Sequence, residues 1–250
     1  MAVVLKSPQE IEKMRHAGRV THDVLRVLRA HVKPGVTTLD LDKVAEEELA
    51  KVGAKAAFKG YGGFPAVLCA SINSEVVHGI PSAKRVLKEG DIVSLDFGAF
   101  VEGYCGDSAI TVIVGDKVDP ETARLVKVTE ASLHEAIKVV RPGATLGDVG
   151  SAVQKLVEAE GFSVVRDFVG HGIGVHMHED PQVPNFGQVG RGMKLRTGMV
   201  IAIEPMVNAG KPDVLVLGDG WTTVTADGSM SAHFEHTVAV TATGSRILTE

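Results

Sequence analysis

The chain has 250 residues, of which 44% are hydrophobic and 23% charged, a composition typical of a globular protein with a sizeable core. The formal charge of −5 argues against a dominant nucleic-acid-binding surface, and no run of 18 apolar residues predicts a membrane span. Two cysteines and an N-terminus without a basic-then-apolar leader favour a reducing compartment, so we expect a cytoplasmic protein. We expect no nucleic-acid substrate and no membrane association.

Two helices are predicted at the start of the chain. Residues 7–10 (SPQE) form a capping box with proline at the first helical position, and the helix should run to about residue 31. Residues 37–40 (TTLD) cap a second helix, which Gly53 ends. Residues 54–80 are rich in glycine and aromatic side chains.

Residues 90–114 predict a buried hairpin that carries two aspartates. Ile92–Leu95 is a short apolar run typical of a core strand, and a second strand is expected over Ser108–Val114. Asp96 and Asp107 would then lie at the strand ends, on either side of a glycine-rich turn. Buried carboxylates need a partner, so either a cation lies between them or both are solvated.

The same plan of two helices and a strand recurs at a constant offset of 108 residues. The KPG at 33–35 matches the RPG at 141–143, Gly53 matches Gly161, and Asp96 matches Glu204. Two halves, roughly 8–115 and 116–250, would pack about a pseudo-twofold axis with these two acids near it. No linker separates the halves, so we expect a single domain over residues 1–250 with a shared sheet.

Histidines and a fifth acid follow in the second half. Residues 168–178 (FVGHGIGVHMH) contain too much glycine for a helix, and in an extended chain His171 and His178 would face opposite ways, which indicates different roles. Residues 231–240 predict one strand on which Glu235 alternates with apolar neighbours.

Four carboxylates and one imidazole form a candidate metal centre, and their charge matches two divalent cations. Oxygen-rich ligation with one imidazole suits Mn, Fe(II) or Co, tolerates Zn, and disfavours a tetrahedral structural zinc site. The HExxH, GxSxG, CxxC and P-loop motifs are absent. The candidate ligands are Asp96, Asp107, His171, Glu204 and Glu235.

These motifs resemble the type I, bacterial-type methionine aminopeptidases of peptidase family M24. The resemblance runs from Ser7 to Leu248 and is carried by FVGHGIGVHMHED, the paired aspartates, IEPMV, SINSEVVHGIP and HFEHT. It implies the α+β pita-bread (creatinase/aminopeptidase) fold, in which pseudo-twofold duplicated halves form an antiparallel sheet covered by helices.

The resemblance also implies an activity and roles for individual residues. The enzyme would remove the N-terminal methionine from nascent proteins and peptides when the second residue is small, using a hydroxide activated by two metal ions. Asp96 would bind one ion, His171 and Glu204 the other, and Asp107 and Glu235 both. Glu204 would also carry a proton to the leaving amine, His178 would stabilise the oxyanion, and His78 would bind the substrate's amide nitrogen.

A methionine pocket is implied beside the metal centre, since a thioether packs well on aromatic edges. Met177 and Phe58 depart from the residues usual in the family, phenylalanine and cysteine, so the width of the pocket is left open. Trp221, flanked by GDG and TT, is expected to form a lid. The expected lining is Phe58, Tyr61, Phe64, Cys69, Met177, Met206 and Trp221, with His78 and His178 contacting the substrate.

Two alternatives stay open. One is an X-Pro aminopeptidase or prolidase, although these usually carry an extra N-terminal domain for which this chain has no room. The other is a catalytically dead pita-bread module that binds peptides, which need not keep all five ligands. The resemblance further implies transient ribosome association, for which no basic patch is evident, and a site within one chain makes a monomer sufficient.

Overall fold

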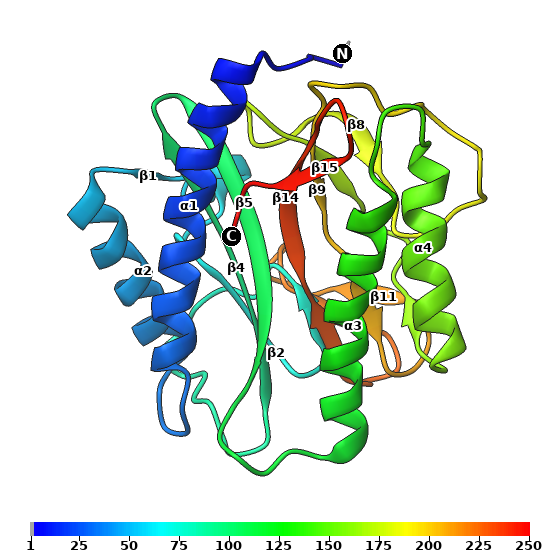
Figure 1. Cartoon of the computed structure of the whole chain (residues 1–250). Helices are drawn as coiled ribbons and strands as arrows, with labels where there is room; N and C mark the ends of the chain where they lie inside the picture. The colour runs from blue at the N-terminus through cyan, green and yellow to red at the C-terminus, as the bar shows by residue number, and fades with distance from the viewer. Residues whose placement is uncertain (1–2) are drawn as a thin grey trace.

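The computed structural model describes residues 3–250 and combines a curled antiparallel sheet with helices (Figure 1). In Figure 1, α1 and α3 run across the front of the sheet, with α2 and α4 on the outer sides. None of the described helices has the length and apolar character needed to cross a membrane. The helices are α1 (Pro8–His31), α2 (Thr38–Val52), α3 (Pro120–Val139) and α4 (Leu146–Ala159), with a short 3₁₀ helix η1 (Tyr61–Gly63).

The main sheet places strands from the two ends of the chain side by side. Its path is β1-β4-β5-β14-β9-β7-β8, with β2 on β4 and β15 on β14, all antiparallel. Its strands are β1 (Lys55–Ala56), β2 (Cys69–Ile72), β4 (Ile92–Val101), β5 (Tyr104–Ile113), β7 (Gly170–Gly172), β8 (Glu179–Val183), β9 (Val200–Ile203), β14 (Glu235–Val240) and β15 (Ser245–Ile247).

Two smaller sheets pack beside the main one. They run β13-β10-β6 and β11-β12-β3. Their strands are β3 (Glu75–Val77), β6 (Ser163–Val164), β10 (Met206–Asn208), β11 (Val214–Val216), β12 (Thr223–Thr225) and β13 (Ser231–His233).

The helix starts follow from local capping. Capping boxes at Ser7, Thr37 and Thr145 accept free N–H groups at the starts of α1, α2 and α4, and the first two confirm the predicted caps. Asp119 caps α3 without a capping box by accepting the Glu121 and Thr122 N–H groups, and Gly53, with φ 65°, ends α2. Each helix then buries one apolar stripe against the strands.

Equivalent contacts recur at the 108-residue offset. Thr37 forms an isolated bridge with Val86, and Thr145 forms the same bridge with Lys194. The N–H of Gly35 donates to the carbonyl of Leu87 at 2.8 Å, and that of Gly143 donates to Leu195 at 2.9 Å. The two halves have separate apolar clusters. One lies between α1, α2, β2 and β4, and the other lies beneath α3 and α4.

The hairpin is longer than predicted, so the expectation that both aspartates end their strands is wrong. Asp96 pairs with Ala109, and Asp107 pairs with Gly98, in the middle of β4 and β5. Gly98 lies within the predicted glycine-rich turn, but it is a packing glycine in β4, because a Cβ there would lie 2.9 Å from the Ala57 Cβ. The turn lies further on, at residues 102 and 103, which both have positive φ.

The single strand predicted over 231–240 is also wrong. It is two strands in different sheets, β13 paired with β10 and β14 paired with β5 and β9. The break falls at Phe234, whose N–H donates to the carbonyl of Pro205 at 3.3 Å. Glu235 therefore begins a strand, and Glu204 directly follows β9.

Candidate metal centre and substrate pocket

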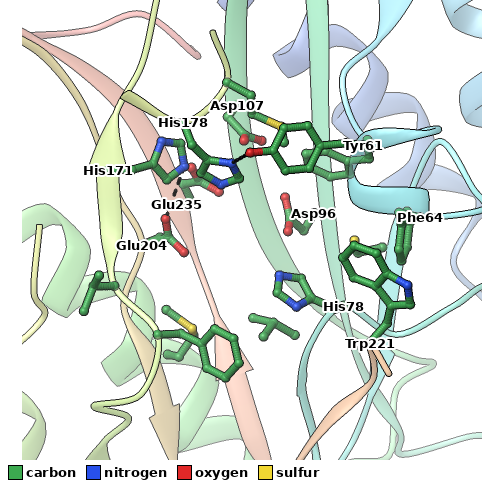
Figure 2. Close-up of a pocket in the computed structure, with 17 residues that line it drawn as sticks. Tyr61, Phe64, His78, Asp96, Asp107, His171, His178, Glu204, Trp221 and Glu235 are labelled. Atoms are coloured by element: carbon green, nitrogen blue, oxygen red, sulfur yellow. Dashed lines mark hydrogen bonds and ion pairs between the residues drawn. The ribbon is translucent and has the colours of Figure 1, made fainter. Parts of the chain in front are cut away.

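A cavity of about 240 Å³ opens beside the centre of the main sheet (Figure 2). It brings together every side chain that the sequence singled out as a site residue. These are Phe58, Tyr61, Phe64, Cys69, His78, Asp96, Asp107, His171, Met177, His178, Glu204, Met206, Trp221 and Glu235. Val77, Phe168 and Val169 also line it and were not predicted.

Adjacent strands bring the acidic side chains to one point. Asp96 and Asp107 come from the paired strands β4 and β5, and Glu235 lies opposite Ala109 on β5. Side chains fix this junction: Ser108 Oγ donates to the carbonyl of Glu235 at 2.6 Å, and the Asp107 N–H donates to Thr237 Oγ1 at 3.1 Å.

His171 faces these carboxylates from β7. Its Nδ1 lies 2.9 Å from the carbonyl of Gly172, and its Nε2 lies 3.5 Å from Glu204 Oε1. Donation from Nδ1 to the carbonyl leaves the Nε2 lone pair available to a metal ion. One ligand atom each from Asp107, His171 and Glu235 lies within 4.8 Å of the others.

The carboxylates carry the electrostatic signature of a cation site. Burial raises the pKa of Asp107 to about 7. Burial, followed by the neighbouring carboxylates, raises the pKa of Asp96, Glu204 and Glu235 well above the usual range. One buried oxygen each of Asp96, Asp107 and Glu235 has no hydrogen-bond partner within the protein. Divalent cations would satisfy these oxygens and offset the repulsion, so the donor set fits the metal.

His171 and His178 do not face opposite ways, contrary to the prediction from an extended chain. Their ring centroids are 4.3 Å apart. The chain between them turns at Gly174, whose N–H donates to the carbonyl of His176 at 3.0 Å. His178 Nδ1 lies 2.7 Å from the Tyr61 hydroxyl, and desolvation lowers the pKa of His178.

Aromatic rings form the other wall of the cavity. Phe64 meets Trp221 edge-on with centroids 5.2 Å apart, and His78 meets Phe168 edge-on at 5.5 Å. Asp219 holds the Trp221 loop by accepting the Trp221 N–H at 2.9 Å. Burial, and then His178, lowers the pKa of His78 to about 4, so its ring is neutral at physiological pH.

Sulfur and apolar side chains complete the pocket. Met177 and Phe58, the two departures from the family pattern, are both buried. Burial and the charge of Asp96 raise the pKa of Cys69, so its thiol stays protonated. The unpredicted Phe168 and Val169 are the first two residues of the FVGHGIGVHMHED motif, and membership of this motif is the one signal that would have found them.

Comparison with known proteins identifies the class to which this fold and site belong. Residues 12–242 match the model of metallopeptidase family M24. The chain therefore belongs to metallopeptidase family M24, whose members use divalent metal ions.

Within that family the chain groups with the bacterial methionine aminopeptidases. It is 51% identical over 247 residues to the methionine aminopeptidase of Clostridium acetobutylicum, covering 99% of this chain and 98% of the relative. The crystal structure of methionine aminopeptidase from Thermotoga maritima matches with a TM-score of 0.98 and 50% identity, covering 100% of both chains. These findings confirm the predicted family, enzyme class and α+β pita-bread fold.

A prolidase from Pyrococcus horikoshii OT3 shares the fold alone. Its TM-score is 0.79 at 23% identity, and the match covers 99% of this chain but 63% of that chain.

Proposed function

We propose that this chain removes the N-terminal methionine from nascent polypeptides and peptides whose second residue is small, with two divalent ions in the metal centre. The observation that carries the proposal is the cluster of partnerless buried carboxylate oxygens at the end of an aromatic, sulfur-lined cavity. The partnerless carboxylate oxygens support metal-dependent hydrolysis, and the aromatic and sulfur-containing lining supports selection of a methionine side chain.

The residues that would hold the two ions divide between the halves of the chain. Asp96 would bind one ion and His171 with Glu204 the other, while Asp107 and Glu235 would contact both. When bound, the ions would lower the pKa of a water molecule and polarise the scissile carbonyl. The oxygen-rich donors favour Mn, Fe(II) or Co over a structural zinc site, and Zn remains compatible.

Three side chains are suited to handle protons and developing charge. Glu204, at the edge of the metal centre, would accept a proton and return it to the leaving amine. Neutral His178, with Nδ1 turned to the Tyr61 hydroxyl, would donate from Nε2 to the oxyanion. His78 would hydrogen-bond the amide nitrogen of the peptide.

We expect a requirement for a free N-terminus, because an unacylated α-amino group offers a lone pair to the metal centre and an acylated N-terminus does not. The cavity wall formed by Phe64, Cys69, Met206 and Trp221 would then receive the thioether side chain.

We also infer the protein's organisation from the fold. A single domain is supported by the main sheet, in which β5 of the first half pairs with β14 of the second. A monomer would suffice, because all residues lining the cavity come from one chain. Cytoplasmic location and transient ribosome contact stay predictions.

One experiment separates this function from its rivals: cleavage of Met-Ala-Ser and Gly-Pro-Ala by protein supplied with Mn²⁺, Co²⁺, Fe²⁺ or Zn²⁺, with elemental analysis of the same samples. We expect methionine release from the first peptide only, and its loss in Asp107→Ala. Asp23→Ala, an exposed aspartate on α1, is the matched control. Preference for Gly-Pro-Ala would indicate an X-Pro peptidase, and metal binding without cleavage would indicate a dead module.

A further inference from the structure

A buried ion pair joins the N-terminal segment to the loop that carries Met177 and His178. Lys6 Nζ lies 2.5 Å from Glu179 Oε2, and the two side chains are only 3% and 12% exposed. Removing one partner of a buried pair leaves an uncompensated charge, so such a pair resists separation far more than a surface pair does. It therefore forms a fixed connection between segments 173 residues apart in sequence.

The ion pair lies directly over the turn at Gly174. A Cβ at this position would lie 2.4 Å from Lys6 Cε and 2.6 Å from Glu179 Oε1, so a larger residue would displace the pair. The second Glu179 oxygen, Oε1, accepts the His176 N–H at 3.1 Å. On the other side, the Cys105 N–H donates to the carbonyl of Gly174 at 2.8 Å. Glu179 thus ties the turn to Lys6 while it bonds the turn's own backbone.

The far end of this connection is also anchored. The Lys6 N–H donates to the carbonyl of Gly198 at 2.7 Å, just before β9 leads to Glu204. Ser7 then caps α1. The Lys6 ammonium group is therefore presented by backbone that is fixed on both sides.

His178 depends on such support because its side chain is exposed, and packing alone does not hold it. Its ring contacts the Tyr61 hydroxyl and the His171 ring, and its backbone is continuous with Glu179. Met177, one residue earlier, is buried in the pocket wall. The position of both side chains is thus set by the loop that the ion pair restrains.

We propose that Lys6, acting through Glu179, is a positioning residue for His178 and Met177. The inference rests on the proposed function, in which His178 acts on the oxyanion. Interactions made in the transition state require placement to within a fraction of an ångström, whereas ground-state binding tolerates a looser loop. Loss of the pair should therefore reduce kcat more than it raises KM.

The test compares Lys6→Met, Glu179→Gln and the double variant Lys6→Met/Glu179→Gln with wild type on Met-Ala-Ser. We expect each to lower kcat roughly tenfold while KM changes less than about threefold. In the double variant neither charge is left unpaired, so thermal stability should return toward wild type while kcat stays low. Hydrogen exchange of the metal-free proteins should show faster exchange of the His176 amide, a readout independent of catalysis.

Lys138→Met is the matched control, because Lys138 pairs with Glu135 at 2.6 Å on the exposed face of α3. It should keep wild-type kcat. Wild-type kcat in a folded Lys6→Met or Glu179→Gln protein, or recovery of kcat with stability in the double variant, would overturn the proposal. If Lys6→Met does not fold, the other two variants decide. An inactive wild type would instead refute the proposed function, and the exchange readout would still test the connection.

Discussion

The Asp107 carboxyl should destabilise the metal-free protein increasingly as pH rises from 5 to 8. The Asp107 side chain is buried, and burial raises its pKa to about 7 from 3.8 in the unfolded chain. The folded state therefore binds the proton more tightly, so this stabilisation is complete below about pH 4 and lost as pH rises through about 7. At about 1.4 kcal/mol per pKa unit it amounts to about 4 kcal/mol, of which about 3 kcal/mol falls between pH 5 and 8. Asp96, Glu204 and Glu235 act in the same direction. The buried histidines act in the opposite direction because burial lowers their pKa, so the contribution of Asp107 is measured against an Asp107→Asn variant.

Thermal unfolding followed by circular dichroism in excess EDTA measures this effect. In a chain of this length, each kcal/mol shifts the midpoint by roughly 2–4 °C, so between pH 5 and 8 the wild-type midpoint should fall by roughly 6–12 °C relative to that of Asp107→Asn. Asp107→Asn should unfold at a higher temperature than wild type at pH 8 without metal, and at a lower one in excess Mn²⁺. A difference in midpoint between wild type and Asp107→Asn that does not change with pH, or an Asp107→Asn variant that is less stable than wild type without metal at pH 8, would refute the reasoning.

His178→Ala should lower kcat roughly 10²–10³-fold because an oxyanion donor is lost, while the metal content stays unchanged. Steady-state kinetics and elemental analysis measure the two quantities, and loss of metal would contradict the assignment of His178. Trp221→Ala should raise KM for Met-Ala-Ser roughly tenfold, because its ring packs on Phe64 in the pocket wall; an unchanged KM would place the ring outside the binding site. Thr145→Ala should lower the free energy of unfolding in urea by about 1 kcal/mol through loss of the α4 cap, and Thr37→Ala at α2 should match it.

The helices could be predicted because their signals are local. A capping residue, its partner three positions later and a terminal glycine lie within one segment, and no distant contact is needed to recognise them. The sequence also predicts that the acidic side chains lie close together, because the 108-residue offset relates Asp96 to Glu204 and a buried carboxylate needs a partner.

The strand limits could not be predicted because they depend on distant contacts. Gly98 is required by Ala57 and Asp107 across the packing interface, and a sequence pattern cannot distinguish such a glycine from a turn. The prediction that His171 and His178 face opposite ways is wrong for a related reason. The turn at Gly174 that brings them together depends on contacts with Cys105 and Lys6.

Some site residues carry no chemical signal at all. Val77, Phe168 and Val169 line the cavity as ordinary apolar side chains, which any core position could hold. The Lys6–Glu179 pair joins residues too far apart in the chain for any local pattern to connect them.

The central claim is that buried carboxylates and His171 hold two divalent ions on which methionine release depends. Titration of the metal-free protein with Mn²⁺, with bound metal and methionine release from Met-Ala-Ser measured in the same samples, tests it most directly. We predict that release begins only as Mn²⁺ binds, that binding saturates at two ions per chain, and that Asp107→Ala abolishes release. Undiminished release without bound metal would contradict the account.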